Sequence, residues 1–531
     1  MLQTEIIEEY FSNFQYVTIV IENEYIDRDY LEDFAGYYVR CFNDYERKCT
    51  RLHFFKCAFC EDDLTILLKG KESFLNQCFL QEHYLGFIVI KKLPRTFIGR
   101  TCLSIKAFNT TAYTLVHRKY AANLFGIQLT VDSVAFQEQD TVVAACATCA
   151  LWFALHKTSE SFNHQIPSPM EITKAANRYF PTTSRAFPNH GLLQEQIPHA
   201  IQEIGLAPSM IGVKHPLYLK FASYAHLKGG IPVILTLDMI DPAIPIKRPR
   251  NLLGDLDEDM DHAVTLTGYK LGGDLKSASE ELNYTFGDAN YDSLNEGEGD
   301  DALVSSEIHP DGKYCSKNEI DFRLTAARMT AFRAHDDQAG PYVEMIFDDI
   351  PAWTAKGKQC FSLSTRWHSK ITGHYYRAIP VSLIIPLYNK IRIPFNMIYR
   401  AVKLFDVFIK ACIPQKIIDT LEWDIFLITN SKFKEEIIGN RMAQEETRKS
   451  ILLKSMPRFL WRATAKKEEE MILDLIFDAT DIEQGACLIL AIEYNDWLFR
   501  IIKHKARNFQ PSSLFEGTAA WNILKYFQEL V

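Results

Sequence analysis

The 531-residue chain lacks several features that mark broad classes of protein. No segment approaches the roughly 18 uninterrupted apolar residues that a membrane-spanning helix needs, and the best run, Ile379–Leu387, is soon followed by Asn389 and Lys390. The first residues, MLQTEIIEEYF, contain no basic stretch followed by an apolar core, so no signal peptide is evident. Repeats and low-complexity linkers are also missing. We therefore expect a globular chain without a membrane span.

The chain also lacks an excess of positive charge and a regular spacing of its cysteines. The formal net charge is −9, whereas a dedicated nucleic-acid binder would carry a basic face, so we expect no nucleic-acid partner. The 12 cysteines show no disulfide framework, which favours a reducing cytoplasm. The pair Cys57 and Cys60 lacks the second pair of a zinc knuckle. Its apolar neighbours Phe54–Phe55 and Leu64–Leu67 predict a hairpin. We expect neither a metal nor a cofactor.

Hydrophobic residues make up 47% of the chain, which is enough for sizeable cores, and the length favours about three domains. The pattern of short strands and amphipathic helices predicts an N-terminal α/β region at 1–130. A central region follows at 131–303, and a mixed α/β region without an assigned role at 304–531. Within this last region, Thr365–Lys416 holds nine Lys or Arg against one acid, Asp406. Apolar residues lie between these cations in the sequence. This favours a packed core from which the long Lys and Arg side chains extend to place their charged ends in solvent.

The central region carries the residues that thiol chemistry needs. Cys146 stands at the start of an apolar segment, Ala145–His156, that predicts a buried helix. A helix N-terminus stabilises a thiolate, so Cys146 is the candidate nucleophile. Cys149, one turn further on, is expected to pack in the core. Upstream, Gln139 could donate a hydrogen bond to an oxyanion, with Gln137 as the alternative.

A candidate base and its partner follow later in the chain. His262 heads Ala263–Gly268, which alternates as a strand with one buried face. A second strand is expected at Leu282–Phe286, and Asp288 just after it could accept the other ring N–H of His262. Asn290 is the alternative, because its side chain can accept the same hydrogen bond.

These residues resemble the papain-like cysteine peptidases, most closely the bacterial C39-like branch, over roughly Val131–Asp292. Three pieces carry the resemblance: Gln139 with Cys146–Leu151, Gly229–Leu235 with His262–Val264, and Tyr284–Asp288. The resemblance implies an α+β fold in which a nucleophile helix packs on an antiparallel sheet, here flanked by N- and C-terminal α/β regions. Gln139 precedes Cys146 by seven positions, where six is usual in the family.

The resemblance also implies a function. We expect a cysteine peptidase that cleaves a peptide or isopeptide bond of a protein or peptide substrate through Cys146, His262 and Asp288, with Gln139 at the oxyanion. The unfamiliar flanks fit a regulatory partner, as in a gated bacterial stress or defence effector. Two alternatives stay open. One is a papain-like acyltransferase that does not hydrolyse its substrate, and the other is a ligand-gated sensor or scaffold.

Overall fold

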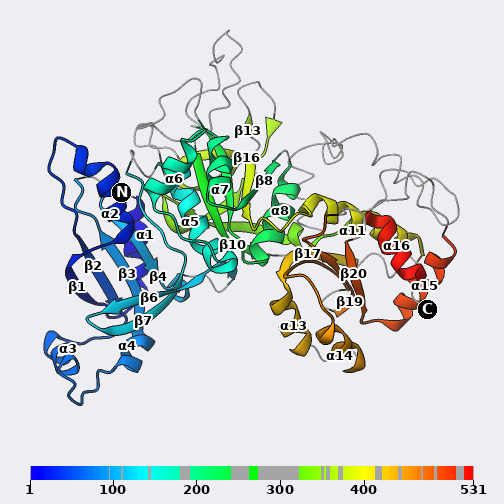
Figure 1. Ribbon diagram of the computed structural model, residues 1–531, viewed down its shortest axis with the longest axis horizontal. Helices are drawn as coiled ribbons and strands as arrows, with labels where there is room; N and C mark the ends of the chain where they lie inside the picture. Colours follow the sequence, from blue (N-terminus) through cyan, green and yellow to red (C-terminus); the bar gives the residue numbers. More distant parts are fainter. Residues whose placement is uncertain are drawn as a thin grey trace, which may run out of the picture. The chain divides into compact units, whose positions relative to one another are not determined.

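The computed structural model describes residues 2–94, 96–108, 112–140, 145–179, 192–213, 215–240, 262–272, 322–348, 352–353, 359–368, 375–412, 421–439, 445–467, 470–482, 487–509 and 519–529 (Figure 1). The chain forms two compact units. The first unit comprises Met1–Val213, Gly230–Leu271 and Thr330–Leu387, and the second comprises Lys214–Gly229, Gly272–Met329 and Tyr388–Val531. Both units are thus built from three separate stretches of sequence. The boundaries near residues 130 and 303 remain a sequence-based prediction.

The first unit begins with an antiparallel sheet whose four strands follow chain order: β1 (Thr18–Tyr25), β2 (Cys49–Phe55), β3 (Tyr84–Ile90) and β4 (Ile98–Leu103). Side chains of β1 alternate between exposed and half-buried, as befits an edge strand, while β3 is buried along almost its whole length. Around this sheet the chain forms α1 (Leu2–Ser12), α2 (Arg28–Gly36), η1 (Tyr38–Arg40), α3 (Glu61–Leu68), α4 (Gln77–His83), η2 (Ile105–Ala107) and the hairpin β6 (Arg118–Leu124) with β7 (Ile127–Ser133).

One local prediction in this region is wrong. The residues after Cys60 form the helix α3 and not the second strand of a hairpin. The reason is a capping arrangement at the helix start, where the Asp63 carboxylate accepts hydrogen bonds from the Cys60 backbone N–H and thiol. Asp63 therefore favours a helix over the strand that the apolar residues predicted.

A second sheet in the first unit has eight strands: β5 (Tyr113–Leu115), β8 (Ala207–Gly212), β9 (Val233–Ile240), β10 (His262–Leu271), β11 (Met329–Asp336), β12 (Gly340–Phe347), β15 (Leu363–His368) and β16 (Tyr375–Leu387). The order runs β11-β12-β15-β16-β9-β10-β5, with β8 on β16. Because β11 also pairs with β10, six of these strands close into a ring. Strand β13 (Ala352–Trp353) pairs antiparallel with β14 (Gln359–Cys360) in a two-stranded sheet of their own among the described residues.

Helix α5 (Cys146–Phe162) packs against this sheet, where Figure 1 shows it beside β10, and α6 (Pro169–Ala176) and α7 (Gln196–Glu203) lie nearby. The predicted segment Ala145–His156 is helical from Cys146 onward and extends to Phe162, where Asn163 takes a left-handed conformation (φ 58°). The Thr265 hydroxyl on β10 donates to the Ala150 carbonyl of α5 at 2.6 Å. This bond fixes the start of α5 relative to the strand that begins at His262.

The second unit is built on an antiparallel sheet of β17 (Leu421–Thr429), β18 (Phe459–Lys467), β19 (Glu470–Asp478) and β20 (Leu488–Glu493), in that order. Its helices are α8 (Pro216–Lys228), η4 (Thr325–Arg328), α11 (Phe395–Cys412), α13 (Asn430–Gly439), α14 (Glu445–Leu453), α15 (Asp496–Arg507) and α16 (Ala519–Glu529). The sequence predicts one helix over Glu435–Ile451. Over the described residues, α13 covers its first part to Gly439 and α14 covers its last part from Glu445, and the residues between them lie outside the description.

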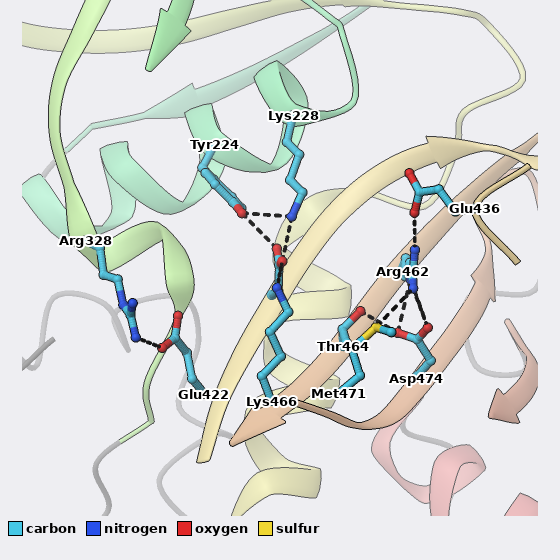
Figure 2. Close-up of polar contacts among 11 residues, drawn as sticks. Tyr224, Lys228, Arg328, Glu422, Glu436, Arg462, Thr464, Lys466, Met471 and Asp474 are labelled. Atoms are coloured by element: carbon cyan, nitrogen blue, oxygen red, sulfur yellow. Dashed lines mark hydrogen bonds and ion pairs between the residues drawn. The ribbon is translucent and has the colours of Figure 1, made fainter. Parts of the chain in front are cut away.

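Part of one face of this sheet is apolar and part is charged. Phe426 and Ile428 of β17 pack with Phe433 and Ile437 of α13 and with Ile451 of α14. Farther along the same strands lie the buried charged residues Asp424, Arg462 and Asp474, and Figure 2 shows the half-buried Lys228 and Lys466 near them. Both Lys228 and Lys466 lie 2.6 Å from the Asp424 carboxylate, and the Arg462 guanidinium contacts Asp474. Each buried carboxylate in this group therefore has a cation beside it.

Among the helices in the described part of the chain, none is long and apolar enough to cross a membrane.

Candidate active site

Cys146 is the first residue of α5, and the extended backbone of Ala145 leads into it. Its side chain is half-buried, so the sulfur sits at the positive end of the helix dipole and remains within reach of solvent. Cys149, one turn further on, is fully buried, and this burial raises its pKa well above the ordinary value. A buried thiol of this kind stays protonated. Of the two cysteines, Cys146 is therefore the better candidate for a reactive sulfur.

His262, the first residue of β10, lies almost completely buried opposite Leu237 of β9. Its Nε2 atom is 3.0 Å from the Asp336 carboxylate. Burial would lower the pKa of the ring, but Asp336 and the Cys146 thiol together raise it well above its ordinary value. Nδ1 is buried and makes no bond of ordinary hydrogen-bond geometry to the described residues. Cys146 thus contributes to the pKa of the ring, although no hydrogen bond of ordinary geometry joins its thiol to His262.

Asp336 ends β11 and is fully buried. One carboxylate oxygen accepts the backbone N–H groups of Gln338 and Ala339 at 2.8 and 3.0 Å. The other faces His262 and accepts the Trp367 indole N–H at 2.6 Å. Burial alone would raise the pKa of Asp336, but His262 and these donors lower it below its usual value. Asp336 is thus a fixed anion that orients the imidazole and favours its charged form.

The turn that carries Asp336 is itself held in place. The buried His335 ring accepts the Tyr342 backbone N–H through Nδ1, and its Nε2 lies 3.1 Å from the Val134 carbonyl. Burial lowers the pKa of His335 to about 4, so the ring is neutral and donates to that carbonyl. The Tyr342 hydroxyl accepts the Val134 N–H at 2.6 Å, and Tyr342 has a positive φ of 52°. These bonds fix the β11–β12 turn to the segment just before the candidate oxyanion glutamines.

The two candidate glutamines follow a short extension of the first sheet. Phe136 pairs with Thr101 of β4, and the Glu138 N–H donates to the Ile98 carbonyl at 3.0 Å. Gln137 is 4% exposed, and its Nε2 has no hydrogen-bond partner among the described residues. Gln139 is half-buried. No described hydrogen bond joins either amide to Cys146, so both remain candidates.

The acid that holds His262 was not singled out from the sequence. Asp288 and its alternative Asn290 lie outside the described residues, so their predicted role stays a prediction. Asp336 follows His262 by 74 positions and begins the sequence Asp-Asp-Gln-Ala-Gly, whose residue types are common in turns of no special function. Only the pairing of β11 with β10, which closes the ring of strands, brings it to the imidazole. An acidic residue at a strand end before a tight turn was the only available signal.

His262, Asp336 and Asp337 also form a three-residue group whose ligand atoms lie within 4.8 Å of one another. An ion between a histidine nitrogen and a carboxylate oxygen needs bonds of about 2.0–2.2 Å on each side. The 3.0 Å between Nε2 and Oδ2 suits a hydrogen bond, and both oxygens of Asp336 already accept other donors, Oδ2 from the Trp367 indole and Oδ1 from two backbone N–H groups. The arrangement fits a hydrogen-bonded acid–imidazole pair better than a set of metal ligands.

Comparison of the chain with protein-family models, curated proteins and solved structures found no match of any kind. The case for a function therefore depends on the geometry of these residues.

Proposed function

We propose that this chain is a papain-like thiol hydrolase that cleaves a peptide or isopeptide bond with Cys146 and His262. Asp336 takes the orienting role that the sequence assigned to Asp288. The observation that carries the proposal is an imidazole whose Nε2 is held by a buried carboxylate at 3.0 Å. A half-buried thiol at a helix N-terminus supports it, because that thiol contributes to the raised pKa of the same imidazole. This is the arrangement that activates a sulfur nucleophile.

The reaction follows from these positions. The Cys146 thiolate attacks the carbonyl carbon of the substrate, and the carbonyl oxygen becomes an oxyanion. The His262 imidazolium then donates its proton to the leaving amine nitrogen as the carbon–nitrogen bond breaks, which leaves a thioester on Cys146. Water attacks the thioester carbon as the neutral imidazole takes a proton from that water, and the carbon–sulfur bond then breaks to release the acid product and restore the Cys146 thiolate with the imidazolium.

The oxyanion needs hydrogen-bond donors in front of Cys146. The backbone N–H of Cys146 is one candidate, because the first N–H groups of a helix have no partner within it. The side-chain amide of Gln137 or Gln139 is the proposed second donor. The buried, unpartnered Nε2 of Gln137 favours that residue over Gln139.

The proposed substrate is a protein or peptide, and the proposed setting is a reducing cytoplasm. None of the nine cysteines whose side chains are described is in a disulfide bond, which suits that setting. Acyl transfer to an amine would use the same thioester, and regulation by a partner through the regions outside the site remains part of the proposal.

A covalent probe tests the proposal. The purified full chain is treated with a peptidyl vinyl sulfone, and the adduct is located by mass spectrometry. We expect one adduct on Cys146, no adduct on that helix in Cys146→Ala, and strongly slowed labelling in His262→Ala. Cys149→Ala is the matched control and should label like the wild type. Labelling that survives Cys146→Ala and is lost in Cys149→Ala would contradict the assignment.

A further inference from the structure

A second acid stands beside the proposed catalytic pair. Asp337 is fully buried in the β11–β12 turn, and its Oδ1 lies 4.0 Å from His262 Nε2. One imidazole therefore faces two buried carboxyl groups, since Asp336 is 3.0 Å from the same nitrogen. Asp336 alone is enough to orient the ring. The second carboxyl adds charge at the imidazole without adding an orienting hydrogen bond, which points to a separate role.

We propose that Asp337 is a positioning residue that sets the charge on His262 and thereby makes breakdown of the thioester, and not its formation, the slow half of the reaction. This inference rests on the proposed function. It concerns the partition of the acyl-enzyme, on which hydrolysis and transfer both depend.

The two halves of the reaction need opposite charge states of the imidazole. Thioester formation needs the imidazolium, because the leaving amine must receive a proton as the carbon–nitrogen bond breaks. Thioester hydrolysis needs the neutral ring, which must accept a proton from the attacking water. After the first half, a ring between two carboxyl groups takes up a new proton from solvent. The thioester is then hydrolysed only in the small fraction of enzyme molecules whose His262 is neutral.

Other titratable groups surround Asp337 on two neighbouring elements. His262 lies on β10 and Asp336 precedes Asp337 in the chain, while on α5 Cys149 feels the charge of Asp337 and also those of Asp140, Lys91 and Cys146. Burial raises the pKa of Asp337 to about 7, against the opposing effect of the His262 charge. As Asp337 ionises near neutral pH, its charge strengthens the hold of His262 on its proton. Removing the carboxyl should therefore release that proton more easily.

The test separates the two half-reactions with an activated substrate. The full-length protein is mixed with a p-nitrophenyl ester of a blocked amino acid between pH 6 and 9. Nitrophenolate release reports thioester formation, and intact mass reports thioester decay. For the wild type we expect a burst close to one equivalent and slow decay. In Asp337→Asn we expect decay at pH 7.5 to accelerate roughly tenfold for each unit by which the pKa of His262 falls, with formation little changed.

Asp337→Glu is the conservative control and should restore slow decay, whereas a purely structural role would lower both half-reactions together. Equal decay rates in the wild type and Asp337→Asn across the pH range would overturn the inference, as would parallel loss of both steps. If Asp337→Asn does not fold, the wild type and Asp337→Glu still test the inference, because the inference requires a burst of nitrophenolate release from both proteins. A wild type that forms no thioester on Cys146 would overturn the proposed function, whereas a thioester that decays as fast as it forms would overturn only this inference.

Discussion

Asp424 in the second unit and Asp336 in the first are both buried carboxylates on strands, but the charges around them differ. The Asp424 carboxylate lies 2.6 Å from the ammonium groups of Lys228 and Lys466 and also accepts the Tyr224 hydroxyl at 2.9 Å. Asp336 faces an imidazole and stands next to a second buried acid, Asp337. The first carboxylate is balanced by two ammonium groups, and the second is balanced by an imidazole, a group whose ordinary pKa lies near neutrality.

This difference distinguishes a structural cluster from the proposed reactive one. Matched charges hold a single ionisation state and stabilise one arrangement of strands. A group of acids around one imidazole changes its protonation within the physiological range, which is what acid–base catalysis needs. Replacing residues in each cluster should therefore produce different kinds of defect.

The largest effect is expected for Asp336→Asn. The amide keeps the size of the side chain but removes the charge that holds the imidazolium, so we expect turnover of a peptide substrate to fall by about 100-fold to 10,000-fold. The melting temperature should change far less. Trp367→Phe removes a single donor to the same carboxylate and should cost much less activity. Turnover of Asp336→Asn within twofold of the wild type would remove Asp336 from the site.

Asp424→Ala should act on stability. It leaves two ammonium groups without their shared carboxylate, so we expect a loss of about 3–5 kcal/mol in the free energy of unfolding of the second unit. Urea denaturation followed by tryptophan fluorescence measures it, because Trp423 and Trp461 are buried in this sheet. Lys466→Met removes one of the two cations and serves as a milder control. A loss below about 1 kcal/mol in Asp424→Ala would show that the cluster is dispensable.

A smaller effect with the opposite sign is expected for Asp337→Asn. The folded state raises the pKa of this acid to about 7, so the folded chain binds a proton that the unfolded chain releases at lower pH. Ionisation of Asp337 therefore costs stability as pH rises from about 4 to 7. Asp337→Asn removes that cost, and we expect it to be more stable than the wild type by about 1–3 kcal/mol at pH 8 and little different at pH 4. Thermal melts at the two pH values measure the difference, and a destabilised variant at pH 8 would contradict it.

The smallest effect is expected for Cys149→Ala. The buried thiol behaves as a small apolar group, so its removal should cost about 1 kcal/mol of stability and leave probe labelling on Cys146 unchanged. Urea denaturation and the labelling rate measure the two quantities. Loss of labelling in this variant would transfer the reactive role to Cys149.

The elements that carry the proposed nucleophile and the proposed base were predictable, because local patterns specify them. An apolar segment after Cys146 predicts the buried helix, and alternation after His262 predicts the strand. Asp336 was not predictable, because its place beside His262 depends on the pairing of two strands separated by a long stretch of chain. At Asp63 the prediction was wrong for a local reason. This one polar residue caps a helix where the apolar pattern favoured a strand.

The most direct test of the account is the position of the acyl group after a brief reaction of the full-length chain with an activated ester. The reaction is quenched in acid, where thioesters survive, and the acylated peptide is identified by mass spectrometry. The account predicts an acyl group on Cys146 that is absent from the His262→Ala variant. An acyl group confined to an exposed cysteine such as Cys60 or Cys78, with none on Cys146, would contradict it.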